Sequence, residues 1–141
     1  KTLQQQGAGL KVMLGMISDF CDKHADNHEA MEFIAPLREK AAEWQQLTLA
    51  IAQRAAANPD EVGAAAYDYL FYSGYVALAY WWARSVVAAA DSGRSRAFSD
   101  AKRETARFYF ARLLPRTLMH RAAIESGAGS LMALDAERFD A

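Results

Sequence analysis

The strongest pattern along the chain is a long apolar stretch in its middle. Between Tyr67 and Arg84 the largest side chains recur at helical spacing and share one helix face. This face carries Tyr67, Leu70, Phe71, Leu78, Trp81 and Trp82, with Gly74 between them. The back of the helix is also apolar, with Tyr69, Tyr72, Val76, Ala79, Tyr80 and Ala83. A helix that is apolar all round is either buried or spans a membrane. We expect other helices to surround it, with its back turned to the first helix or to a further domain.

Helical periodicity continues on both sides of this stretch. The predicted helices cover about residues 3–24, 31–57, 59–90 and 97–126. Proline cannot donate a backbone hydrogen bond, so Pro115 should bend the last of them. A short helix is expected between Ser130 and Phe139. Because short connections make successive helices antiparallel, the sequence predicts an all-α fold, a four-helix up-and-down bundle with a short C-terminal helix.

The uncharged part of the third predicted helix is too short to cross a membrane. Between Gly63 and Ala90 its charged residues are Asp68 and Arg84, which leaves positions 69–83 uncharged. A membrane-spanning helix needs about 20 apolar residues. The neighbouring helices are amphipathic in the manner of water-soluble bundles, so we do not expect membrane insertion.

Composition narrows the class of protein further. The chain has 141 residues, which suits one domain, and its 16 basic and 17 acidic side chains give a formal charge of -1. That balance argues against nucleic-acid binding. Cys21 stands alone, so an internal disulfide is excluded and a cytoplasmic location is expected. The chain starts at Lys1 without an initiating Met or a signal sequence, and we expect a fragment of a longer protein.

One cluster of potential metal ligands lies at the end of the first helix. It comprises Cys21, His24, Asp26, His28 and Glu29. A helical His pair four residues apart can hold a metal ion, but the Asp-Asn turn separates these two histidines. No second cluster completes a tetrahedral site. We interpret the segment as a solvated helix end and assign no metal ligand.

The fourth predicted helix has cations on the face that should turn inward. Lys102, Arg112 and Arg116 share this face with Phe98 and Tyr109, whereas Arg103 and Arg107 are expected to face solvent. Buried cations require partners. Asp68 on the third helix is the nearest carboxylate in the predicted arrangement. The cations are expected either to pair inside the bundle or to extend their charged ends into the solvent. The alternative is that they face an anion on a ligand or on another domain.

The remaining candidate chemistry is sparse. Trp44, Trp81, Trp82 and six tyrosines could form the core or line a ligand pocket. No nucleophile elbow, phosphate-binding loop or HExxH motif occurs. His120 stands alone and is expected on the surface. We therefore assign no catalytic and no cofactor-binding residue, and a self-contained enzyme lacks the acid and base groups it would need.

Two groups of motifs resemble one known family in their order and separation. The first comprises Tyr69-Leu70-Phe71, Gly74-Tyr75-Val76-Ala77 and Trp82-Ala83-Arg84. The second comprises Phe98-x-x-x-Lys102-x-x-Thr105-Ala106-Arg107-Phe108-Tyr109 and Leu113-Leu114-Pro115. Together they resemble the extra C-terminal helical domain of the longer bacterial acyl-CoA dehydrogenases. The resemblance extends over nearly the whole chain and is strongest after Asn58.

This resemblance implies a role within a larger flavoenzyme. In that family the FAD site, the acyl-CoA pocket and the catalytic glutamate lie in the preceding dehydrogenase domains, and no position of this chain matches them. The parent reaction would oxidise an acyl-CoA thioester to the 2,3-enoyl thioester. The chain would be an inactive accessory domain that packs on those domains or on a neighbouring subunit of a homo-oligomer. The alternative is an independent helical module that binds an amphipathic acid or acyl ligand.

Overall fold

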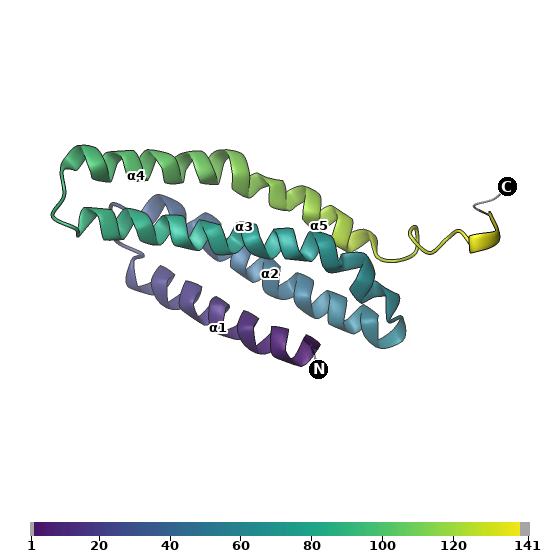
Figure 1. Ribbon diagram of the computed structural model, residues 1–141. Coiled ribbons are helices and arrows are strands. Elements are labelled where there is room, and N and C mark those ends of the chain that lie inside the picture. Colours follow the sequence, from purple (N-terminus) through teal and green to yellow (C-terminus); the bar gives the residue numbers. More distant parts are fainter. Residues whose placement is uncertain (1, 139–141) are drawn as a thin grey trace.

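Helices follow one another through nearly the whole chain in the computed structural model, which describes residues 2–138. Their order is α1 (Thr2–Lys23), α2 (Met31–Ala57), α3 (Asp60–Ala90), α4 (Arg96–Phe108), the π-helical turn η1 (Tyr109–Leu113), the 3-10 turn η2 (Leu114–Arg116), α5 (Thr117–Ser126) and the 3-10 turn η3 (Ala136–Arg138). Figure 1 shows them as an up-and-down bundle. No strand occurs in the described range. The predicted all-α class is confirmed, and the predicted limits of the first three helices agree with the structure to within one residue. The fourth, predicted over residues 97–126, begins at Arg96 and ends at Ser126, but it is divided into α4, η1, η2 and α5.

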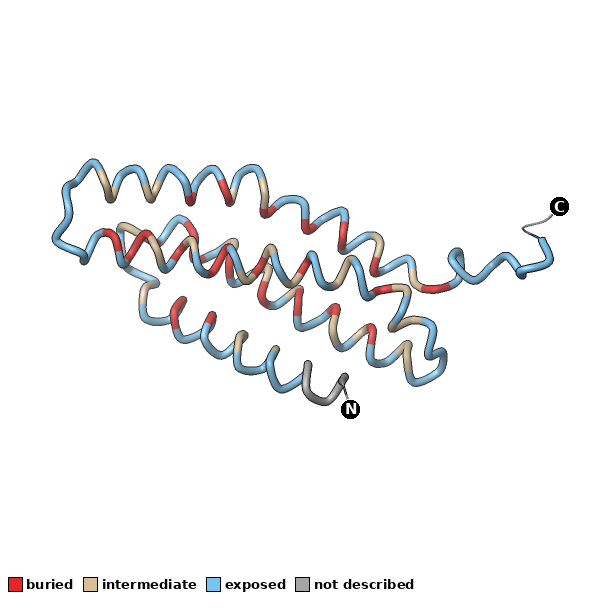
Figure 2. Tube along the Cα trace, viewed as in Figure 1, coloured by how far each residue is buried: buried red, intermediate tan, exposed pale blue. Residues whose placement is uncertain are grey.

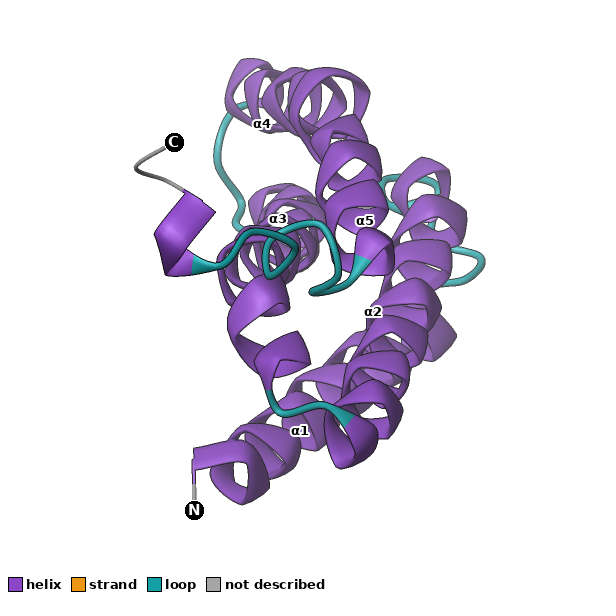
Figure 3. Ribbon diagram, turned by 90° about the vertical axis from the view of Figure 1, so that its right-hand side faces the viewer, coloured by secondary structure: helices purple, strands orange, loops and turns teal. Residues whose placement is uncertain are grey.

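Helix α3 is the central element of the bundle. Seen end-on, α2 lies on one side of it and α4 on another, while α1 lies beside α2 (Figure 3). α1 reaches α3 where the ring of Phe20 packs edge-on against Tyr80, with 5.7 Å between ring centroids. Despite its apolar composition α3 is no membrane segment: none of the helices in residues 2–138 has the length and hydrophobicity that crossing a bilayer requires.

The core is formed mainly by α2 and α3, whose buried positions face the inside of the bundle (Figure 2). On α2 they recur mostly every three or four residues, which places them on one side of the helix. They are Phe33, Ile34, Leu37, Ala41, Trp44, Leu47 and Ile51. The isoleucine at position 17 of α1 and Ile124 of α5 are also buried, each at 1% exposure. All the long helices therefore contribute to one hydrophobic core.

Contrary to expectation, the buried face of α3 is the one that carries mostly smaller side chains. Its buried residues are Ala65, Tyr72, Val76, Ala79, Tyr80, Ala83, Val86, Val87 and Ala89. Small side chains let neighbouring helices approach closely and keep packing dense. The back of the helix was correctly expected to meet α1, as the Phe20–Tyr80 contact shows. The opposite face, with the largest side chains, is left uncovered.

The fourth predicted helix is interrupted at Pro115. The backbone changes from α-helix to the π turn η1 and then to η2, which contains the proline, before α5 begins. Pro115 has no N–H to bond the carbonyl of Ala111, so the ladder must be rearranged there. The predicted bend is thus confirmed as a π and 3-10 interruption. It changes which way later side chains point.

The C-terminal part of the chain leaves the bundle after Gly127 (Figure 1). Gly127 ends α5 with φ +69°, a left-handed conformation that glycine adopts readily. Beyond it, the short C-terminal helix expected between Ser130 and Phe139 is the three-residue turn Ala136–Arg138. Phe139 lies outside the described residues.

Candidate interaction surface

The uncovered side of α3 carries a row of large apolar residues, which we call the outer face. It comprises Tyr67, Leu70, Phe71, Leu78 and Trp81, together with Gly74. These side chains are 42–69% exposed. Their spacing places them along one side of the helix. Single exposed apolar residues are common on proteins, but a contiguous row of this kind marks an interaction site.

Other apolar side chains, on α5 and after it, are also exposed. Met119 of α5 is 64% exposed, and Leu131, Met132 and Leu134 after α5 are 55–67% exposed. Trp82 is the member of the predicted large face that is half-buried, because it turns toward α4. There the ammonium of Lys102 lies 6.0 Å from its ring centroid.

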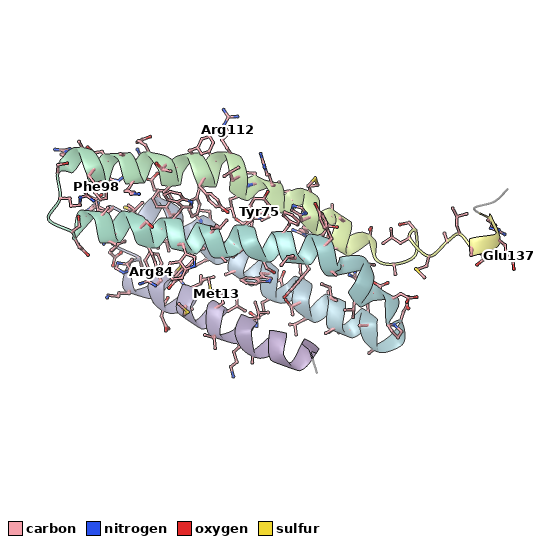
Figure 4. The ribbon with its side chains drawn as sticks, viewed as in Figure 1. Met13, Tyr75, Arg84, Phe98, Arg112 and Glu137 are labelled. Atoms are coloured by element: carbon pink, nitrogen blue, oxygen red, sulfur yellow. The ribbon has the colours of Figure 1, made fainter. Side chains whose placement is uncertain are left out.

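His120 is buried against the edge of the outer face, which corrects the expectation of an isolated surface histidine. Its Nδ1 lies 2.8 Å from Oδ1 of Asp68, and the residue is only 3% exposed. The imidazole stacks on Phe71 and Tyr75, with ring centroids 5.4 and 5.7 Å away. Tyr75 points between α3 and α5 in Figure 4. The hydrogen bond and the stacking together fasten α5 to α3.

The three predicted inward cations do not pair with Asp68. Arg112 and Arg116 are exposed, and Arg112 points away from the bundle in Figure 4. The π turn explains the error for Arg116, because an extra residue in a turn rotates later side chains by about 100°. Lys102 is half-buried as expected, but it lies over the aromatic rings of Trp82 and Phe98. Internal pairing of these cations with Asp68 is therefore wrong.

Two arginines expected to face solvent form ion pairs that join α4 to α2 and to the turn before it. Arg103 forms an ion pair with Glu29, and Nη2 of Arg107 lies 2.8 Å from Oε1 of Glu32. Arg103 is only 23% exposed. These pairs close the side of α4 that lies away from the outer face. The expectation that Arg103 faces solvent is therefore wrong, whereas Arg107 is exposed as expected, with its side chain 46% accessible.

A polar network that the sequence did not reveal lies between α2, α3 and α5. The hydroxyl of buried Tyr72 donates to Oε1 of Glu43 at 2.5 Å, and Nζ of Lys40 donates to the same oxygen at 3.1 Å. Arg121 donates to Oε2 at 2.8 Å. Burial alone would raise the pKa of Glu43, but these hydrogen bonds and the nearby cations outweigh it and lower that pKa. Burial, followed by the bond to Glu43, raises the pKa of Tyr72.

The potential metal ligands at the end of α1 are held by other contacts. Cys21 is buried, and burial raises the pKa of its thiol. The ring of His24 packs on Phe20 at 4.7 Å, and Glu29 pairs with Arg103. Among the described residues no three His, Cys, Asp or Glu side chains are grouped closely enough to hold a metal ion.

The tryptophans do not line a shared pocket. Trp44 is buried in the core, whereas Trp81 belongs to the outer face. Two surface hollows flank α2, and neither contains a Trp or Tyr. The more enclosed one holds about 110 Å³ and is lined by Glu43, Gln46, Leu47, Ala50, Arg54, Arg121 and Glu125. The other is lined by Glu32, Phe33, Pro36, Arg107, Phe110 and Ala111.

Comparison with known proteins relates most of the chain to one family. A family model described as acetyl-CoA dehydrogenase C-terminal-like matches residues 13–135. No curated protein matches the chain. The matched range includes all of α2, α3, α4 and α5, and therefore the whole outer face.

Proposed function

Since the chain belongs to the acetyl-CoA dehydrogenase C-terminal-like family, we propose that it is the non-catalytic C-terminal accessory domain of a FAD-dependent acyl-CoA dehydrogenase. The parent enzyme would oxidise the α,β bond of an acyl-CoA thioester, with a glutamate taking the α proton and FAD the hydride. Those groups would belong to preceding dehydrogenase domains. Residues 1–141 would form a single helical domain of a longer cytoplasmic chain.

Neither of the two hollows beside α2 suits a flavin. The more enclosed hollow holds about 110 Å³, and Glu43 and Glu125 contribute carboxylates to its lining. Cofactor sites usually measure about 300–1,000 Å³, so this hollow is too small. The other hollow holds about 360 Å³, but it is more open and its lining includes the carboxylate of Glu32. Carboxylates repel a pyrophosphate. In the proposed parent enzyme the dehydrogenase domains would therefore bind FAD.

The observation that carries the proposal is the exposed outer face of α3. Leu70 and Tyr67 are 69% and 65% exposed in this chain, which costs free energy in water at about 25 cal/mol per Å² of apolar surface. Covering this face with the dehydrogenase domains or with a neighbouring subunit removes that cost. Such packing would stabilise a homo-oligomer or shape access to the substrate.

The experiment that tests this role compares the parent enzyme with and without residues 1–141. We expect deletion to change its oligomeric state or its activity toward acyl-CoA, measured by sedimentation and by a dye-reduction assay. A truncated enzyme with the same assembly, the same thermal stability and the same kcat/KM would contradict an accessory role.

The independent binding module is the second candidate function. Lys102 above Trp82 and Phe98 is the feature that favours it, because an aromatic surface beside a cation suits an amphipathic acid. Native mass spectrometry of the chain would then show a retained acyl ligand, and loss of that ligand in Lys102→Ala. A chain that carries no ligand would contradict the module.

A further inference from the structure

Gly74 lies in the middle of the outer face without a role inside the domain. It occupies the centre of the 31-residue helix α3, where glycine costs about 1 kcal/mol relative to alanine. A Cβ built on Gly74 would meet nothing within 4 Å among the described residues, and its φ is not positive. Neither close packing within the chain nor backbone geometry therefore requires a glycine there.

Apart from Phe71, whose counterpart three residues after Gly74 is Ala77, the residues of the outer face are arranged symmetrically on either side of Gly74. Four residues before and after it stand Leu70 and Leu78, and seven residues before and after it stand Tyr67 and Trp81. At eleven residues stand the small side chains of Gly63 and Ser85. The steps of three and four keep all of these positions on one side of the helix. These positions therefore follow the same order from either end of the helix. A small residue comes first, then an aromatic residue, then a leucine, with Gly74 at the centre.

A two-fold symmetric contact requires this kind of pattern. In an isologous interface the same patch occurs on both partners, so residue i meets j and j meets i. Two antiparallel copies of α3 that cross at Gly74 would place Leu70 against Leu78 of the second copy, and Tyr67 against Trp81. The missing side chain at the crossing point would let the two backbones approach closely.

Charge and shape also suit a second copy. None of the symmetric positions is charged, so self-association brings no like charges together. The flanking Asp68 is already bonded to His120, and Arg84 lies over the ring of Trp81 at 5.0 Å. The end-on view shows α4 and α1 on opposite sides of α3 (Figure 3), and the large side chains of the outer face are exposed.

From these observations we propose that two copies of the chain dimerise through their α3 helices, antiparallel and crossing at Gly74. The proposal rests on the accessory role proposed above, in which another part of the enzyme covers the outer face. The outer face of one subunit is then covered by the same face of a second subunit. The register is fixed by Leu70 opposite Leu78.

Cross-linking tests the register directly. In the double variant Leu70→Cys with Leu78→Cys, a short bis-maleimide should link two chains, because the thiol at position 70 of one copy faces the thiol at position 78 of the other. Either single variant should give little dimer, since position 70 does not face itself. The buried native Cys21 is present in every variant and serves as an internal control. Equal cross-linking of the single and double variants would overturn the antiparallel register.

The glycine is tested by adding a side chain at the crossing point. Gly74→Leu fits the single chain, since a Cβ there meets nothing within 4 Å, and it should raise helix propensity. We nevertheless expect it to weaken dimerisation at least ~30-fold, as for loss of a central contact. Gly15→Leu on α1 is the matched control, with equally open surroundings, and should leave the dimer intact. Unchanged dimerisation of Gly74→Leu in sedimentation experiments would overturn the crossing point.

Cross-linking and thiol protection together distinguish the dimer from the accessory role. If no variant of the chain cross-links, and a thiol at position 78 is still protected in the parent enzyme, the dehydrogenase domains cover the outer face. The dimer is then wrong and the accessory role stands. If position 78 is neither cross-linked nor protected, both proposals fail.

Discussion

Nδ1 of His120 lies 2.8 Å from Oδ1 of Asp68 and joins α5 to α3 across 52 positions of the chain. The histidine is almost fully buried and packs between Phe71 and Tyr75. Its hydrogen bond therefore fixes both the position of α5 and the edge of the outer face. A buried polar group that loses its partner costs about 1–3 kcal/mol.

We accordingly expect Asp68→Ala to lower the free energy of unfolding by about 1–3 kcal/mol, because it leaves the imidazole without its acceptor. Asp19→Ala, an exposed carboxylate on α1, is the control and should change the free energy by less than about 0.5 kcal/mol. Urea denaturation measures both. Equal stability of the two variants would show that the pair does not hold α5 to α3.

The Tyr72–Glu43 bond predicts a pH-dependent contribution to stability. The pKa of Glu43 is lowered in the folded protein from an ordinary value of 4.5. The resulting stabilisation is therefore fully present above about pH 4.5 and is lost as the pH falls through the folded-state pKa. Tyr72→Phe removes one of the hydrogen bonds that lower this pKa.

For Tyr72→Phe we expect a loss of about 1.5–3 kcal/mol at pH 7, as for a hydrogen bond to a charged group. The difference from the unsubstituted chain should shrink below about pH 4.5, because protonated Glu43 gains less from the hydroxyl. Urea denaturation at pH 7 and pH 3.5 measures it. A difference that is the same at both pH values would contradict this account of the network.

Gly127 predicts a position-specific effect of alanine. Its φ of +69° and ψ of −170° belong to a region that is essentially restricted to glycine. An added Cβ would also lie 3.1 Å from both carboxylate oxygens of Glu61. Oε1 of Glu61 accepts the backbone N–H of Ala128 at 3.1 Å, and Oε2 lies 3.0 Å from Nε of Arg54.

Gly127→Ala should therefore cost about 1–3 kcal/mol. Gly129→Ala is the matched control, because Gly129 has neither a positive φ nor a neighbour within 4 Å, and should be close to neutral. Thermal unfolding measures the change in stability of both variants. If both alanines behave alike, the end of α5 is not held by this contact.

The sequence predicted the helices well because their limits are encoded locally. Pro59 and the turn at residues 91–95 separate one helix from the next, and Pro115 interrupts the last one where the structure changes to η1 and η2. The apolar positions of α2 from Ile34 to Ile51 follow the same helical spacing that predicts the element. Such signals depend only on neighbours within a few residues.

The candidate surface could be predicted only in part, because hydrophobicity does not say which of two apolar faces is covered. On α3 the face with Val76 and Ala83 became the core, since small residues permit closer helix packing, and the face with Leu70 and Trp81 stayed open. The partnership of Asp68 with His120 is not local. A signal was available, however, because Asp68 is an isolated charge in an apolar helix.

The central claim is that the outer face of α3 is covered in the intact enzyme, and thiol labelling tests it most directly. Leu78 of the outer face and Leu49 of α2 are similarly exposed in this chain, at 50% and 56%. The measurement is the rate of maleimide labelling of Leu78→Cys and Leu49→Cys, each in the intact parent enzyme. We predict that the thiol at position 78 reacts at least ~10-fold more slowly than the one at 49, since burial at an interface excludes the reagent. Equal labelling rates at the two positions would contradict the account.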